Sequence, residues 1–150
     1  METKTSIISN SVEDTERLAA ETARSAVPGA VFALRGDLGA GKSVFARAFI
    51  RELGVDGPIP SPTFTIVQEY PVAENPAGIA EINHVDLYRI DGADAALAFG
   101  LDERFGDPEA VSLVEWPERA EELMPENTTD VRIRRIDDER REIEILPRGG

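Results

Sequence analysis

The spacing of apolar residues first indicates a helix over residues 11–26. Ser11 is a candidate N-cap, and acidic residues follow it, where the positive end of a helix dipole favours them. Apolar positions then recur at helical spacing, namely Leu18, Ala19, Ala23 and Ala26. Pro28 and Gly29 are expected to end this helix.

A second unit combines a short apolar run with another helical pattern. Residues 31–34 (VFAL) are suited to a buried strand, and residues 43–53 place apolar side chains on one helical face. These side chains are Phe45, Ala48, Phe49 and Leu53. Because Gly54 ends the pattern, the predicted order is strand, loop, helix.

The remaining chain shows both kinds of pattern. Residues 64–70 and 79–88 alternate apolar and polar positions on either side of a turn, which predicts an antiparallel hairpin. The further predicted elements are a helix over 91–101, a buried strand over 111–114, a helix from Pro117 to about residue 124, and tail strands over 130–136 and 142–146. Together the elements predict an α/β fold with a mixed sheet flanked by helices.

Length and composition narrow this picture. A chain of 150 residues with 41% hydrophobic residues can build one core, so we expect a single domain over residues 1–150. No run of about 18 apolar residues could span a bilayer, and residues 1–10 lack the pattern of a secretory signal. We therefore expect a cytoplasmic protein without membrane association.

Charge and metal-binding residues exclude several functions. The sequence has no cysteine and one histidine, His84, so a metal would have to be held by oxygen. The net charge of -13 opposes direct binding to nucleic acid, which depends on Lys and Arg at the phosphates. If RNA is involved, we expect a partner protein to hold it.

Residues 36–43 (GDLGAGKS) carry the clearest motif. Their spacing is that of a P-loop, with Gly36, Gly41, Lys42 and Ser43 at the defining positions between a predicted strand and a predicted helix. Glycines let backbone N–H groups face phosphate oxygens, Lys42 adds a positive charge, and Ser43 offers a hydroxyl to Mg²⁺. The motif predicts a P-loop NTPase-like domain; the alternative is a glycine-rich turn without a ligand.

Two carboxylates follow apolar runs further along the chain. Asp86 follows INHV and Glu115 follows VSLV, so each is expected at a strand end, where parallel-sheet enzymes place their chemistry. Either could order the Mg²⁺ shell or the attacking water, and spacing does not decide between them. A solvated carboxylate is the alternative for each.

Four further features allow a functional and a structural interpretation. Thr63, in the proline-rich SPTFT, is a candidate switch threonine or part of a tight turn. His84 is expected to be structural, and Trp116 is expected to pack in the core. The basic stretch 132–141 could bring an arginine to a nucleotide, although its interleaved acids favour a solvated hairpin.

The motifs GDLGAGKS, SPTFTIV, HVDLYRI and LVEWPER occur in this order, and the chain resembles the TsaE (YjeE) family over nearly its whole length. These are bacterial ATPases that support threonylcarbamoyl modification of adenosine 37 in tRNA. The resemblance implies an ATP hydrolase that is slow alone and stimulated by partners. The implied partners are TsaD and TsaB homologues, whose complex it resets, so that tRNA is reached only indirectly.

The resemblance also implies roles for individual residues. Lys42, Asp86 and Glu115 would be catalytic, with Mg²⁺ held by Ser43 and Glu115 and with Asp86 as the acidic residue of the second nucleotide motif. The family usually has threonine at the position of Ser43, a change that keeps the hydroxyl. The implied ATP-binding residues are Ser11, Thr15, Leu38, Gly39, Ala40, Gly41, Lys42, Ser43 and Arg141.

Two alternative functions share the P-loop. A small-molecule kinase needs an acceptor pocket and a mobile lid, for which this chain has no obvious insertion. A nucleotide-dependent switch that acts by binding alone is the second alternative. A guanine-specific form is disfavoured because none of the asparagines is followed by lysine, as the Asn-Lys-x-Asp motif requires.

Overall fold

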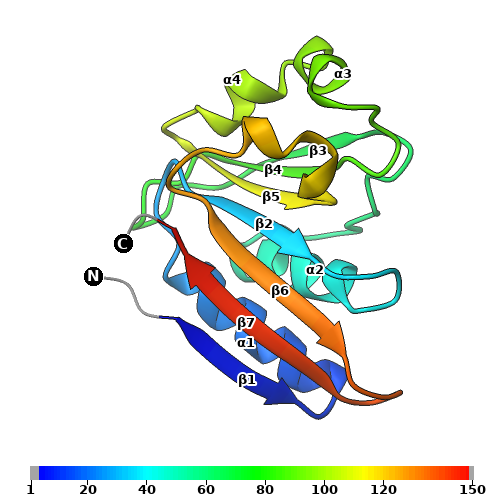
Figure 1. Ribbon diagram of the computed structural model, residues 1–150. Coiled ribbons are helices and arrows are strands. Elements are labelled where there is room, and N and C mark those ends of the chain that lie inside the picture. The colour runs from blue at the N-terminus through cyan, green and yellow to red at the C-terminus, as the bar shows by residue number, and fades with distance from the viewer. Residues whose placement is uncertain (1–3, 149–150) are drawn as a thin grey trace.

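Seven strands form one sheet in the computed structural model, which describes residues 4–148 (Figure 1). The sheet order is β1-β7-β6-β2-β5-β4-β3. The strands are β1 (Thr5–Ser9), β2 (Val31–Arg35), β3 (Val67–Pro71), β4 (Glu81–Asp86), β5 (Ala110–Glu115), β6 (Thr129–Arg135) and β7 (Arg141–Pro147). The helices are α1 (Val12–Arg24), α2 (Lys42–Glu52), α3 (Ala93–Ala98), α4 (Leu101–Phe105) and the 3₁₀ helix η1 (Pro117–Leu123).

The four central strands, β6, β2, β5 and β4, run parallel. The flanking strands pair antiparallel: β3 with β4, β7 with β6, and β1 with β7. Parallel strands bring their carboxyl ends to one edge, and Figure 1 shows the loops after β2, β4 and β5 at the same end of the sheet. This arrangement confirms the predicted mixed sheet flanked by helices.

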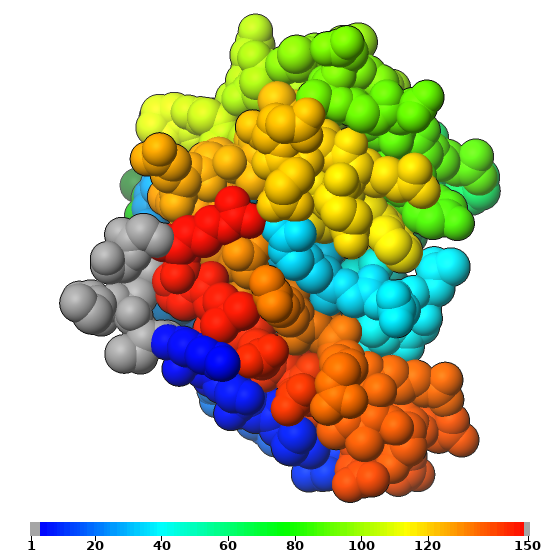
Figure 2. Space-filling view, viewed as in Figure 1, coloured from blue at the N-terminus to red at the C-terminus, as the bar shows by residue number. Residues whose placement is uncertain are grey.

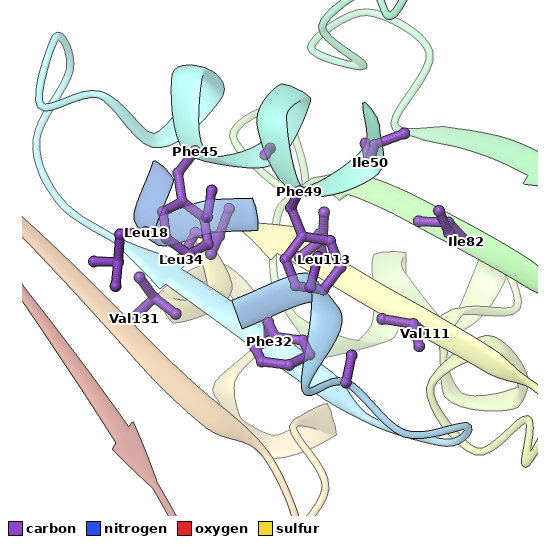
Figure 3. Close-up of a cluster of buried hydrophobic side chains, with 14 of the residues drawn as sticks. Leu18, Phe32, Leu34, Phe45, Phe49, Ile50, Ile82, Val111, Leu113 and Val131 are labelled. Atoms are coloured by element: carbon purple, nitrogen blue, oxygen red, sulfur yellow. The ribbon is translucent and has the colours of Figure 1, made fainter. Parts of the chain in front are cut away.

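The helices α1 and α2 cover one face of the sheet (Figure 1). Figure 3 shows Phe45 and Phe49 of α2 directed at the sheet side chains. The ring centroids of Phe49 and Phe32 are 5.0 Å apart in an edge-to-face arrangement. Phe45 and Phe49 are fully buried, as their spacing predicts. Each contributes about 1.5–3 kcal/mol through removal of apolar surface from water.

The opposite face of β2, β5 and β4 is covered by α3, α4 and η1. In β2, Phe32 points to the α1 and α2 side, whereas Val31 and Ala33 pack with the second group of helices. The strand is buried on both faces because it lies in the middle of the sheet, which explains its unbroken apolar run. Among residues 4–148, no helix is long and apolar enough to cross a membrane.

Several element predictions are confirmed. Helix α1 is capped by Ser11, whose Oγ accepts a hydrogen bond of 3.1 Å from the backbone N–H of Asp14. Its apolar stripe is buried from Leu18 to Ala23. The hairpin of β3 and β4 is antiparallel, with Val67 opposite Val85.

Other predictions differ from the structure. The predicted strand over 64–70 begins only at Val67, because Ile66 donates its N–H to the Pro62 carbonyl in a turn. The predicted helix over 91–101 is two short helices, separated where Gly100 adopts a left-handed φ of 70°. Strand β1 is an addition that sequence patterning does not predict.

Candidate functional site

The P-loop leaves the carboxyl end of β2 and enters α2 at Lys42. Gly41, the residue before the helix, has a left-handed φ of 113° and makes no side-chain cap. The first N–H groups of α2 therefore lack a side-chain acceptor, and an uncapped helix N-terminus behind a glycine-rich loop attracts anions. Leu38 lies at the tip of the loop, 73% exposed.

Gly36 brings the start of the loop against β6. A Cβ at this position would lie 2.4 Å from the carbonyl oxygen of Ile133, which is too close for any side chain. The glycine is therefore required for close approach between loop and strand, and it fixes the direction in which the P-loop leaves the sheet.

Lys42 is almost fully buried inside the loop, at 5% exposure. Its Nζ donates a hydrogen bond of 2.5 Å to the carbonyl of Gly36 and lies 3.3 Å from the ring centroid of Trp116. Burial lowers the pKa of the Lys42 ammonium, although the carboxylate of Glu115 acts in the opposite direction. A positive charge is thus held at the centre of the loop.

Glu115 lies at the end of β5, nearly buried, and is contacted from two sides. Its Oε1 is 3.5 Å from the hydroxyl of Ser43, and its Oε2 is 2.7 Å from Nε2 of His84. Because a carboxylate only accepts hydrogen bonds, Nε2 of His84 carries a proton and is the donor in this hydrogen bond. His84 Nδ1 has no hydrogen-bond partner within residues 4–148.

Asp86, the parallel-register partner of Glu115, ends β4. Its Oδ2 accepts from the hydroxyl of Thr63 at 2.9 Å, and its Oδ1 accepts from the backbone N–H of Tyr88 at 2.9 Å. The carboxylate is 2% exposed, so these two bonds hold it in one orientation. The switch candidate Thr63 is therefore in direct contact with a candidate catalytic carboxylate.

A cavity of about 400 Å³ adjoins the P-loop on the side of α1. Ser11, Thr15, Gly41 and Arg141 are among its lining residues. The hydroxyl of Thr15 is paired with that of buried Ser9 at 2.7 Å. Figure 2 shows the turn between β6 and β7 (orange) next to the loop after β2 (cyan).

Arg141 bridges the tail hairpin and the P-loop. Its Nε donates to the carbonyl of Ala40 at 2.7 Å, and one terminal nitrogen donates to the carbonyl of Gly39 at 3.3 Å. Three other arginines of the hairpin form ion pairs on the surface, as the solvated-hairpin interpretation predicts: Arg134 with Glu142, Arg135 with Asp138 and Arg140 with Asp137. Arg141 is therefore the arginine of this stretch that reaches the loop.

The structure brings every predicted site residue to this end of the sheet. Sequence reasoning missed two contacts, that of Trp116 with Lys42 and that of His84 with Glu115. The signal for His84 was its place two residues before Asp86 on the same strand. Trp116 is half-buried beside the site as well as against the core, with a left-handed φ of 59°.

Comparisons with known proteins agree in pointing to one family. The family described as threonylcarbamoyl adenosine biosynthesis protein TsaE matches residues 9–143. The tRNA threonylcarbamoyladenosine biosynthesis protein TsaE of Bacillus subtilis is 41% identical over 131 residues, covering 87% of this chain and 78% of the relative. The TsaE protein of Aquifex aeolicus is 38% identical over 145 residues, covering 90% of this chain and 99% of the relative.

A solved structure shows the same fold. The crystal structure of YdiB from Bacillus subtilis matches all of this chain and 88% of its own, with a TM-score of 0.79 and 35% sequence identity.

Proposed function

The chain belongs to the TsaE family of threonylcarbamoyl adenosine biosynthesis proteins, and from this premise we propose that it is a partner-stimulated ATPase. The observation that carries the proposal is the convergence of Lys42, Ser43 and Glu115 on a P-loop with an uncapped helix N-terminus. In this proposal the ATPase cycle supports N6-threonylcarbamoyladenosine modification of tRNA.

The geometry supports a specific placement of ATP. Residues 38–43 would surround the phosphates with backbone N–H groups, and Lys42 would exchange its bond to the Gly36 carbonyl for a phosphate oxygen. The cavity beside α1 is large enough for part of a nucleoside, and Ser11, Thr15 and Arg141 would line it. In this placement Gly41 would adjoin both the phosphates and the nucleoside, because it belongs to the loop and also lines the cavity.

The oxygen ligands at the site fit Mg²⁺. Ser43 and Glu115 offer a hydroxyl and a carboxylate 3.5 Å apart, and oxygen is the ligand that this ion prefers. Mg²⁺ usually keeps several waters and shares phosphate oxygens, so Ser43 and Glu115 would supply part of its coordination. When bound, Mg²⁺ would neutralise developing charge on the phosphoryl oxygens.

The remaining residues act by position and charge. Lys42 would offset negative charge on the transferring phosphoryl group, and a buried ammonium does this more strongly than a solvated one. His84 holds one oxygen of Glu115, which leaves the other directed at Ser43. Asp86, fixed by Thr63 and by the N–H of Tyr88, would order the attacking water or the metal shell.

We extend the proposal to the partners. Homologues of TsaD and TsaB are the expected partners, and hydrolysis would reset their complex between turnovers. The net charge of -13 supports contact with tRNA only through these proteins.

The test measures phosphate release with and without purified TsaD and TsaB homologues. Lys42→Ala and Glu115→Ala are expected to lose partner-stimulated turnover by about 100-fold or more while remaining folded. Exposed Lys4→Ala and Glu126→Ala are matched controls that should keep turnover within about twofold. Full turnover by Lys42→Ala would contradict the proposal, and a phosphorylated small molecule in place of free phosphate would indicate a kinase.

A further inference from the structure

An exposed group of aromatic and arginine side chains lies beside the site, on the side away from the α1 cavity. Phe64 is 79% exposed, and the guanidinium carbon of Arg89 lies 4.3 Å from its ring centroid. Tyr88 is also exposed, and the guanidinium carbon of Arg119 lies 5.6 Å from its ring centroid. We call Phe64, Tyr88, Arg89 and Arg119 the Phe64 surface.

The two arginines of the Phe64 surface differ from most arginines of this acidic chain. Within residues 4–148, no carboxylate pairs with Arg89 or Arg119. Elsewhere, arginines such as Arg24 and Arg148 form ion pairs. A guanidinium over an aromatic ring can still donate hydrogen bonds to a carboxylate, so the Phe64 surface presents two arginines without a carboxylate partner on a protein of net charge -13.

The Phe64 surface is held in place rather than carried on a loose loop. Ile66, two residues after Phe64, is buried in the core at 6% exposure, with a left-handed φ of 71°. A β-branched residue adopts this conformation only where the surroundings enforce it. Thr63 is tied to Asp86 on the other side of Phe64, so the ring is displayed by a loop anchored at both ends.

Each part of the Phe64 surface adjoins a residue of the proposed nucleotide site. Phe64 follows Thr63, and the N–H of Tyr88 binds Asp86. The ring of Tyr88 in turn lies 5.1 Å from that of Trp116, which contacts Lys42. A shift of Thr63, Asp86 or Trp116 on nucleotide binding would therefore reach the Phe64 surface through a single contact.

We propose that the Phe64 surface docks a protein partner that offers an apolar pocket for the Phe64 ring and carboxylates for Arg89 and Arg119. Exposed aromatic and arginine side chains are the residue types that dominate binding energy in protein interfaces. The inference rests on the proposed function, because it assigns the partner-binding face of the same site.

A second copy of this chain and RNA fit the Phe64 surface less well than an acidic protein partner does. A two-fold contact with a second copy would bring these arginines toward their own equivalents, which repel. RNA binding depends on Lys and Arg at many phosphates, whereas the Phe64 surface offers two arginines on a chain of net charge -13.

The first experiment identifies what touches Phe64. Benzoylphenylalanine is placed at position 64 in living cells, and ultraviolet light couples it to its neighbour, which mass spectrometry identifies. The same group at exposed Phe99 is the control. A protein adduct specific to position 64 is expected, whereas an RNA adduct, an adduct with a second copy or no specific adduct would overturn the proposal.

The second experiment purifies the protein that cross-links to position 64 and measures its binding to the ATP-loaded chain. Phe64→Ala and Arg89→Ala should each weaken binding at least tenfold, with ATP affinity unchanged. Arg47→Ala, which removes an exposed arginine of α2, should stay within twofold. An equal loss in Arg47→Ala, or no loss in Arg89→Ala, would overturn the docking surface. The cross-linked protein could be neither TsaD nor TsaB and still bind Phe64→Ala and Arg89→Ala more weakly. That result would support the docking surface and contradict the proposed partners.

Discussion

The hydroxyl of Thr63 donates a hydrogen bond of 2.9 Å to Oδ2 of Asp86 and so ties the loop before β3 to the end of β4. The second oxygen of Asp86 is held by the N–H of Tyr88. Thr63 is therefore the side chain through which the loop and a candidate catalytic carboxylate can move together.

Replacing Thr63 by Val tests that link. Removing the hydroxyl leaves Oδ2 of Asp86 without its donor, and such a loss is worth about 1–3 kcal/mol, so we expect partner-stimulated turnover to fall about tenfold or more. The Kd for ATP should change much less, because the P-loop is intact. Thr65→Val in the same loop is the control, Thr63→Ser should restore turnover, and an unchanged rate in Thr63→Val would disprove the link.

Gly36→Ala tests the close approach of the P-loop to β6. Its Cβ would lie 2.4 Å from the Ile133 carbonyl oxygen, so the loop must shift, and we expect a loss of about 2 kcal/mol of stability together with weakened ATP binding. Gly57→Ala is the control for steric contact, because Gly57 has a left-handed φ of 82° but an added Cβ would meet no atom within 4 Å. It should cost only about 1 kcal/mol and leave ATP binding unchanged. Denaturant unfolding and titration with ATP measure both effects.

Arg141→Ala tests the bridge between the tail hairpin and the P-loop. The guanidinium holds the carbonyls of Ala40 and Gly39, so its loss should loosen the loop and weaken ATP binding about tenfold. Arg140→Ala removes a neighbouring arginine that pairs with Asp137 in the turn, and its ATP affinity should stay within about twofold. Equal affinities for the two variants would show that Arg141 has no part in the site.

Glu81 lies far from the site and predicts that the stability of the protein depends on pH. A hydrogen bond with Glu69, partial burial and the charge of Glu69 raise the pKa of Glu81 to about 7 from an ordinary value of 4.5. The folded protein thus binds a proton that the unfolded chain releases, so this stabilisation is complete below pH 4.5 and is lost as pH rises through 7. The pKa of Glu69 is lowered, which acts in the opposite direction at more acidic pH.

Glu81→Gln mimics the protonated side chain at every pH. Its Tm should exceed that of the unmodified protein at pH 8, where both carboxylates are charged, and should match it at pH 5. Exposed Glu126→Gln is the control and should give no pH-dependent difference. A constant Tm difference across this range would exclude the raised pKa of Glu81.

The candidate site was the most predictable part of the fold, because its sequence signals are local. The P-loop depends on glycines and a lysine within eight consecutive positions, and Asp86 and Glu115 each follow a buried run. Parallel pairing of β4 and β5 then makes them register partners, which follows once both strands are assigned to one sheet.

The missed features depend on contacts between distant segments. Strand β1 is a five-residue strand that pairs with β7, and only that partner makes it a strand. Helix 91–101 breaks at Gly100 because the turn lets Leu101 and Phe105 reach the core. The contact of Trp116 with Lys42 depends on a left-handed backbone at a bulky residue, which no local propensity favours.

The position of Trp116 predicts that its fluorescence responds to ligand binding at the P-loop. The sequence contains one tryptophan, and its ring lies 3.3 Å from the ammonium of the P-loop lysine. Any ligand that draws Lys42 away from the ring changes the electric field at the indole, and with it the colour and yield of its emission. We therefore expect the emission of this one tryptophan to change when a ligand binds at the P-loop, without a label and without a partner.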